Sequence, residues 1–178
     1  KTTVTTLPSL TPHLRHNTMD MLPNWSLSYD AQKYKPANQS LGLMAKYRVD
    51  LVPSRTRIII GTDLDYSPGS RHEDAITATR VGSIYTDYTM GAVSYDYDVT
   101  YAGVSPYVHG EFSPTEKLRI TAGLRYDHMS YNYENNLSTL TTGSHRRPES
   151  TSVDYQHLSP KLGANYALAK NHNGFIAY

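Results

Sequence analysis

The stretch that decides the fold reads Leu118-Arg-Ile-Thr-Ala-Gly-Leu-Arg-Tyr-Asp127. The residues of one parity are apolar or aromatic: Leu118, Ile120, Ala122, Leu124 and Tyr126. The residues of the other parity are polar, charged or glycine: Arg119, Thr121, Gly123, Arg125 and Asp127. Successive side chains of a β-strand point to opposite faces, so this period of two predicts a strand with one apolar and one polar face. A capping-box spacing at Ser113-x-x-Glu116 would instead open a helix, but the downstream period favours the strand.

The same alternation recurs along the chain. Four further segments show it, namely residues 41–51, 57–66, 101–112 and 158–168, and a sixth strand is expected to begin near Gly174. Short polar links join these segments in pairs, at residues 52–55, 113–117 and 169–173. Links of this length are typical of β-hairpins. The sequence therefore predicts an all-β, antiparallel chain.

Long polar stretches separate the predicted hairpins. Residues 67–98 and 132–152 are interpreted as loops, and residues 7–40, which contain four prolines, are interpreted mostly as a third. Loops of this length are uncommon in compact soluble domains. Short turns at one end of the strands and long loops at the other are typical of outer-membrane barrels.

Composition narrows the class of protein. The chain has 178 residues and a formal net charge of +1, without the basic excess of a nucleic-acid-binding protein. It contains no cysteine, which excludes disulfides, thiolate metal sites and thiol nucleophiles. Tyrosine is far commoner than phenylalanine, at 16 against 2, which suggests rings with one apolar and one wet end. The longest apolar runs have about five residues, whereas a spanning helix needs roughly 20.

Alternation alone does not separate a soluble β-sandwich from a membrane barrel, because both have one apolar face. Three features favour the barrel. Full charges recur on the polar parity, the loop lengths are asymmetric, and Tyr66, Tyr126 and Tyr166 lie near strand ends on the apolar parity. That placement suits an interfacial girdle, where the ring enters lipid and the hydroxyl stays at the headgroups.

Three stretches resemble the β-barrel of TonB-dependent outer-membrane receptors, particularly the ferric-siderophore subgroup. They are Arg57-Ile-Ile-Ile-Gly-Thr-Asp-Leu-Asp65; Val104-Ser-Pro-Tyr-Val-His-Gly-Glu111 with the strand 118–127; and Leu158-Ser-Pro-Lys-Leu-Gly-Ala-Asn-Tyr166 with Gly174-Phe-Ile-Ala-Tyr178. Their order and spacing also match, so the resemblance covers roughly residues 41–178. These motifs are structural and do not identify a ligand.

The resemblance implies a 22-stranded barrel of which residues 1–178 are one part, with short periplasmic turns and long extracellular loops. The family's plug domain, TonB box and remaining strands are absent here, so the chain resembles an internal fragment. The implied function is ferric-siderophore uptake across the outer membrane of a Gram-negative cell. The implied partners are the ferric siderophore, the TonB complex through the missing N-terminal region, the lipid bilayer and lipopolysaccharide, with no nucleic acid.

Candidate site residues fall into two sets. Tyrosines of the expected loops are ligand-contact candidates, because flat chelates suit ring stacking and hydroxyl donors; they are Tyr85, Tyr88, Tyr95, Tyr97, Tyr131 and Tyr133. The same rings could instead continue strands above the membrane. Cations of the polar parity are expected to face the lumen and to pair with a plug or with neighbouring carboxylates; they are Lys46, Arg48, Arg57, Arg119, Arg125 and Lys161.

The other polar clusters in the sequence do not indicate a metal, anion-binding or catalytic site. His72, Glu73 and Asp74 are adjacent and would point to alternate faces, so we expect no shared metal. The basic patch 145–147 could meet lipopolysaccharide phosphates, although a solvated loop is the simpler reading. No catalytic, metal or cofactor motif is present, and we expect no enzyme activity. The alternatives are a passive porin-like or adhesin barrel and a soluble, tyrosine-rich, carbohydrate-binding β-sandwich.

Overall fold

The computed structural model describes residues 4–24, 30–52 and 55–178. Over these residues the chain forms one antiparallel sheet in which each strand pairs mainly with its sequence neighbours. The strands are β1 (Thr5–Thr18), β2 (Met21–Asn24), β3 (Gln32–Val52), β4 (Thr56–Val81), β5 (Ile84–Phe112), β6 (Leu118–Asn135), β7 (Thr151–Ala169) and β8 (His172–Ala177). The sheet order is β1-β3-β4-β5-β6-β7-β8, and β2 pairs with β3 beside β1. The prediction of an antiparallel, all-β chain is confirmed.

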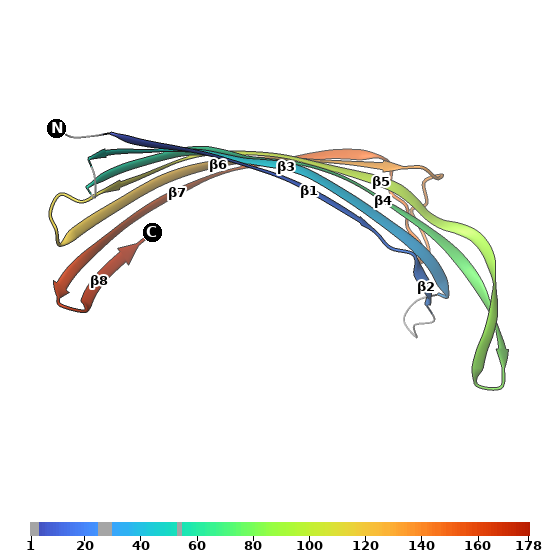
Figure 1. Cartoon of the computed structure of the whole chain (residues 1–178). Coiled ribbons are helices and arrows are strands. Elements are labelled where there is room, and N and C mark those ends of the chain that lie inside the picture. The colour runs from blue at the N-terminus through green and yellow to red at the C-terminus, as the bar shows by residue number, and fades with distance from the viewer. Residues whose placement is uncertain (1–3, 25–29, 53–54) are drawn as a thin grey trace.

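The sheet is strongly curved and open at both edges (Figure 1). The connections after β3, β5 and β7 lie at one end of the strands, and those after β4 and β6 lie at the other (Figure 1). At the second end, the β4–β5 turn has two residues, whereas the β6–β7 connection covers residues 136–150. The Ser113–Lys117 link is a turn between two strands rather than the start of a helix. In the β7–β8 turn, Asn171 adopts a left-handed conformation with φ of 70°, which asparagine tolerates. Pro53 of the first predicted turn lies outside the described residues.

Two of the predicted long loops are wrong. Residues 67–98 belong to β4 and β5, which stay paired from Thr56 opposite Phe112 to Val81 opposite Ile84. The hairpin turns only at Gly82, whose φ of 63° favours glycine. A strand that leaves the membrane has water on both sides and carries polar residues on both faces. Its sequence therefore shows no alternation of apolar and polar residues, and the strand cannot be recognised from that pattern. The third expected loop contains most of β1, all of β2 and the start of β3. Strand β1 pairs with β3 from Thr5 opposite Asp50 to Thr18 opposite Ala37, and prolines at positions 8 and 12 obscured its alternation. Residues 25–29 of this expected loop lie outside the described residues.

The second expected loop is partly confirmed. Strand β6 continues to Asn135 and β7 begins at Thr151, so the connection covers residues 136–150. An isolated bridge between Leu140 and Arg147 closes it into a compact loop. The connection lies at the long-loop end of the sheet.

Strand register collects the apolar parity on one face of the sheet. Leu43 lies opposite Leu64, which lies opposite Val104 on the next strand. No second sheet covers this face in the described ranges, and Ile76, at 8% exposed, is the one buried hydrophobic residue in those ranges. Ile60 and Leu162 are 50% and 59% exposed. A β-sandwich would bury these side chains against a second sheet, so this face needs an apolar surrounding.

The apolar band has the height of a membrane. On β6 it runs from Leu118 to Tyr126, and on β7 it runs from Leu158 to Tyr166, nine positions in each case. A tilted strand crosses the hydrocarbon core with about 9–11 residues. Leu118 pairs with Tyr166 and Tyr126 pairs with Leu158, so the two tyrosines mark opposite margins of the band. This is the arrangement expected of an interfacial girdle.

The polar parity forms the opposite face, which we assign to the concave side. Side chains on the inside of a curved sheet converge and shield one another. Asp50, Ser105 and Asp127 on this face are 17%, 8% and 21% exposed. The large apolar residues on the other face of the sheet, such as Ile60 and Leu162, are far more exposed. Gly61 also belongs to this face, where a Cβ would come within 2.5 Å of the Tyr107 ring. The glycine therefore makes room for a large side chain to lie flat along the wall.

Candidate ligand-contact site

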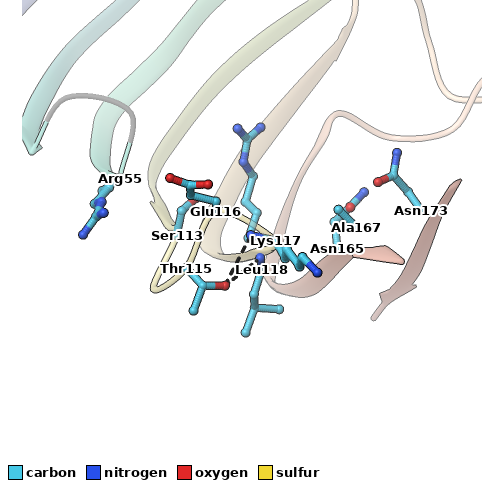
Figure 2. Close-up of a pocket in the computed structure, with 10 residues that line it drawn as sticks. Arg55, Ser113, Thr115, Glu116, Lys117, Leu118, Asn165, Ala167 and Asn173 are labelled. Atoms are coloured by element: carbon cyan, nitrogen blue, oxygen red, sulfur yellow. Dashed lines mark hydrogen bonds between the residues drawn. The ribbon is translucent and has the colours of Figure 1, made fainter. Parts of the chain in front are cut away.

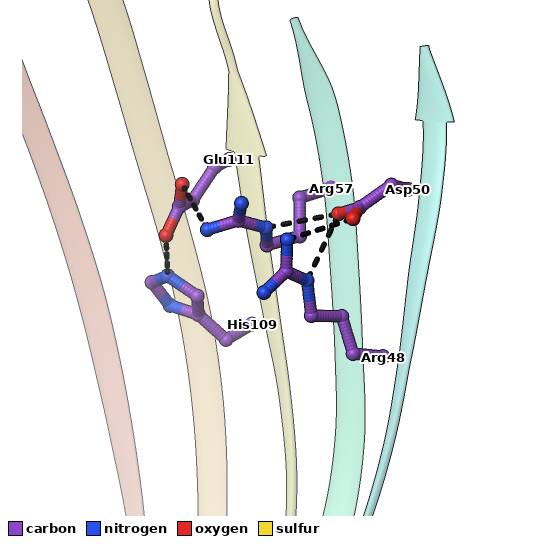
Figure 3. A network of polar contacts seen from close by, with 5 residues as sticks. All are labelled: Arg48, Asp50, Arg57, His109 and Glu111. Atoms are coloured by element: carbon purple, nitrogen blue, oxygen red, sulfur yellow. Dashed lines mark hydrogen bonds and ion pairs between the residues drawn. The ribbon is translucent and has the colours of Figure 1, made fainter. Parts of the chain in front are cut away.

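The concave face carries a chain of ion pairs near the short-turn end (Figure 3). Arg48 donates two hydrogen bonds to Asp50, of 3.0 and 2.7 Å. Arg57, on the neighbouring strand, donates to the same carboxylate at 3.0 Å and to Glu111 at 3.4 Å. His109 lies 3.5 Å from the other oxygen of Glu111. The network therefore links β3, β4 and β5 and neutralises the two arginines within the wall.

A second network lies further along the strands. Arg125 of β6 donates to Asp63 of β4 at 2.7 Å and to Asp127 of its own strand at 2.8 Å. The Ser105 hydroxyl of β5 donates to Asp127 at 2.7 Å. Carboxylates thus pair with three of the predicted lumen cations: Arg57 and Arg125 have partners on neighbouring or next-but-one strands, and Arg48 pairs with Asp50 of its own strand.

The remaining three predicted lumen cations lie on the same face and have no partner among the described residues. Register places Lys46 opposite Gly61, Lys161 opposite Gly123, and Arg119 opposite Asn165. None of the three side chains forms a hydrogen bond or ion pair with the part of the chain that the structure describes. Lys46 and Lys161 lie along the wall, whereas Arg119 lies at its short-turn end, next to the first residue of β6.

Towards the long-loop end, the concave face becomes aromatic around Arg71 and Glu73. Glu73 is 1% exposed and accepts a hydrogen bond from Arg71, two residues away on the same face of β4. The Arg71 guanidinium lies over the rings of Tyr34 and Tyr95, at 5.2 and 5.9 Å from their centroids. The Nε atom of Arg71 is buried and has no hydrogen-bond partner among the described residues. This N–H is closed to solvent, so a ligand would meet the guanidinium through its more exposed atoms.

A hollow of about 330 Å³ opens beside Arg71. Asn17, Asn38, Gly69, Tyr97 and Val99 line it together with Arg71. Small-molecule sites usually measure about 300–1,000 Å³ and combine apolar walls with a few polar groups. Burial lowers the Arg71 pKa, but the hydrogen bond and charge of Glu73 outweigh that effect and raise it overall. The hollow therefore contains a permanent cation next to a phenol ring.

Tyrosines continue from this hollow across three strands. The rings of Tyr97 and Tyr133 lie 5.3 Å apart. Tyr101 contacts Tyr131 at 5.0 Å, and Tyr131 contacts Tyr155 of β7 at 6.2 Å. Burial, with added repulsion from Tyr97 and Tyr95, raises the pKa of Tyr133, so its phenol stays neutral and can donate a hydrogen bond. These tyrosines form an aromatic surface that runs across β5, β6 and β7 on the concave face.

The 136–150 connection folds back over this end of the sheet. The Asn136 side chain donates to Asp98 at 2.9 Å. Arg147 donates to the carbonyl of Ser94 at 3.1 Å. His145 lies 2.9 Å from Asp30 and contacts the Tyr95 ring edge-on at 5.7 Å. The predicted basic patch is thus partly used to hold the loop against the strands.

The structure brings together four of the six predicted ligand-contact tyrosines, Tyr95, Tyr97, Tyr131 and Tyr133, on one face. Tyr85 and Tyr88 lie near the tip of the β4–β5 hairpin, where Arg80 lies 5.2 Å from the Tyr85 ring centroid. The tyrosines were predicted to lie in loops, but all six belong to β5 or β6. Sequence reasoning missed the participating residues Tyr34, Arg71, Tyr101 and Tyr155. The shared parity of residues 95, 97 and 101 could have indicated Tyr101, whereas Tyr34 and Tyr155 depend on register.

Residues 72–74 alternate between the two faces of β4. Glu73 faces Arg71, while His72 lies 3.3 Å from Asp74 and 3.6 Å from Asp96 on the opposite parity. No group of three or more histidine, aspartate or glutamate side chains that could hold a metal ion occurs among the described residues.

These features define a class. A curved, single-layered antiparallel sheet with a bare apolar band on one face and a charged concave face is a segment of a transmembrane β-barrel wall. A family model described as TonB dependent receptor-like, beta-barrel, matches residues 6–178. The chain belongs to this family, and its location is the outer membrane of Gram-negative cells.

Known structures agree with this fold. Copper transporter OprC superposes with a TM-score of 0.61 over 92% of the chain at 13% identity, a level that shows the fold alone. The chain spans 26% of the length of that structure. No curated protein matches the sequence. No helix in the described residues is long and apolar enough to span a membrane.

Proposed function

We propose that this chain forms part of the wall of an outer-membrane receptor that takes up a ferric siderophore with energy delivered through TonB. The hollow beside Arg71 and Tyr97 carries the proposal. It opens on the concave face near the long-loop end, where a ligand from outside the cell would first meet the wall. The chelating groups of catecholates and hydroxamates are planar, and ferric tris-catecholates are anionic, so these ligands suit tyrosine rings and a guanidinium.

The proposed mechanism is binding and passage, without covalent chemistry and without a resident cofactor. The chelate would contact Tyr97, Tyr133 and the guanidinium of Arg71 at the outer end. Its release inward would follow rearrangement of a plug by TonB, as the family resemblance implies. The ion-paired wall between β3 and β6 would keep its shape during that step, because its arginines are already neutralised.

Uptake of radioactive iron by whole cells tests this proposal. A strain that makes no siderophore of its own would carry the complete receptor gene or its deletion, and would receive a ferric catecholate or a ferric hydroxamate. We expect the deletion to abolish uptake from one of the two chelates, and we expect iron limitation to induce the gene. Unchanged iron uptake from both chelates would contradict the siderophore assignment.

Two controls separate the competing functions. Uptake that persists in a strain without TonB would instead support a passive porin-like barrel. Copper(II) uptake that depends on the gene, with no dependence of ferric chelate uptake, would indicate the cargo named for the structural neighbour OprC.

A further inference from the structure

A second hollow, of about 510 Å³, lies at the short-turn end of the sheet and is distinct from the ligand-contact site. Arg55 from the β3–β4 connection, the turn at residues 113–118, and Asn173 near the start of β8 surround it (Figure 2). Three hairpin ends therefore converge on one space at the rim of the wall. A smaller hollow of about 180 Å³ adjoins it and shares Arg55, Ser113 and Arg119 in its lining.

The charge of this hollow is unbalanced. Its lining contains three cations, Arg55, Lys117 and Arg119, and one carboxylate, Glu116. None of these four side chains forms an ion pair or a side-chain hydrogen bond within residues 4–24, 30–52 and 55–178. This contrasts with the neighbouring Arg57, which Asp50 and Glu111 neutralise. The free cations at the rim therefore differ from the paired cations of the wall.

The rest of the lining favours a hydrogen-bonding ligand with an extended shape. Ser113, Asn165 and Asn173 offer a hydroxyl and two amides across the width of three hairpins. The Thr115 hydroxyl is already used, since it accepts hydrogen bonds from the backbone N–H groups of Lys117 and Leu118, at 3.3 and 3.1 Å (Figure 2). Amides can pair with a peptide backbone, while guanidinium forks match carboxylates in a bidentate geometry.

We infer that this rim hollow binds a carboxylate-rich peptide segment of a separate protein on the periplasmic side. Arg55 and Arg119 would each hold one carboxylate, and Asn165 and Asn173 would pair with the peptide backbone. A separate protein is favoured because turn residues and the adjoining ends of β6, β7 and β8 line the hollow at the short-turn rim, which a partner can reach from the periplasmic side. The inference does not depend on the identity of the transported ligand.

Fluorescence anisotropy on the complete receptor in detergent tests this inference. The probe is a labelled, glutamate-rich peptide, and the control probe has glutamine at every glutamate position. We expect saturable binding of the acidic probe that weakens with rising salt, and no saturable binding of the glutamine probe. Failure of the acidic probe to bind the wild-type receptor, as when a segment of the receptor itself fills the hollow, would overturn the inference.

Variants then locate the site. The double substitution Arg55→Glu with Arg119→Glu should weaken binding about tenfold or more, as expected for the loss of two charge-assisted contacts. The milder pair Arg55→Gln with Arg119→Gln should weaken it less and guards against misfolding. Lys170→Glu, an exposed cation at the same end but outside the hollow, is the matched control and should retain binding. Equal binding by all variants, or saturation of the same hollow by inorganic phosphate alone, would overturn the peptide assignment.

Discussion

Arg125 on β6 donates a hydrogen bond of 2.7 Å to Asp63 on β4, across the full width of the intervening strand β5. Sheet neighbours usually interact with the adjacent strand, so this contact fixes the relative position of three strands. Because the pair lies on the concave face, it also removes a free cation from the interior of the wall.

We expect this pair to contribute modestly to stability. Both side chains are 37% exposed, so solvent screening limits the coupling to about 0.5–1 kcal/mol. A double-mutant cycle with Arg125→Met and Asp63→Asn in the complete receptor measures it by denaturant unfolding in detergent. A coupling energy of zero would mean that Asp127 alone holds the arginine.

Adjacent isoleucines on β4 test the assignment of the two faces. Ile60 lies in the middle of the apolar band, so Ile60→Lys should destabilise the folded receptor in lipid by about 2–4 kcal/mol. Ile59 has the opposite parity and lies opposite His109 on the polar face. Ile59→Lys should therefore have a much smaller effect on the free energy of unfolding. Equal effects of the two substitutions would contradict the assignment of faces.

The Arg71–Glu73 pair should stabilise the outer part of the β4–β5 hairpin. Arg71→Met would leave the carboxylate of Glu73, which is almost fully buried, without its cation. Loss of one partner of a fully buried pair costs about 3–5 kcal/mol, and the partial exposure of Arg71 reduces the expected loss to about 2 kcal/mol. Arg80→Met, near the exposed tip, is the control and should change stability little. The measurement is the unfolding midpoint of the complete receptor.

Substitution of the aromatic surface should weaken chelate binding. Tyr97→Ala and Tyr133→Ala each remove a stacking ring, worth about 0.5–1.5 kcal/mol, or roughly twofold to tenfold in Kd. Tyr88→Ala near the hairpin tip should leave Kd unchanged. Intrinsic fluorescence quenching by the ferric chelate that the receptor transports reports the affinity. If Tyr88→Ala weakened binding as much as Tyr97→Ala, the site would extend to the hairpin tip.

The 136–150 connection should become accessible when its anchor is removed. Arg147→Ala deletes the hydrogen bonds to the carbonyls of Ser94 and Ser138, and it leaves Arg146 as a trypsin site in the loop. We expect faster tryptic cleavage after Arg146 in the folded receptor. Arg15→Ala, on the distant strand β1, is the control. Cleavage at the wild-type rate in Arg147→Ala would show that His145 and Asn136 hold the loop by themselves.

Much of this wall could be predicted from the sequence. A period of two in segments such as 118–127 determined the strands. It also separated an apolar face from a charged one, because neighbouring side chains of a strand point to opposite faces. Short links at residues 113–117 and 169–173 determined hairpins. The same local reasoning failed for residues 67–98, because a strand with water on both faces carries no apolar parity.

The tertiary structure decided which side chains of different strands lie next to one another. Register, rather than any local motif, placed Arg125 next to Asp63 and left Arg119 without a partner in the described part of the chain, since pairing depends on which residues of the other strands lie nearby. It also placed Tyr34, Arg71 and Tyr95 in one cluster, although three different strands supply them. Sequence periodicity determines the face of a strand on which a residue lies, but only the hydrogen-bonded register determines its neighbours across the sheet.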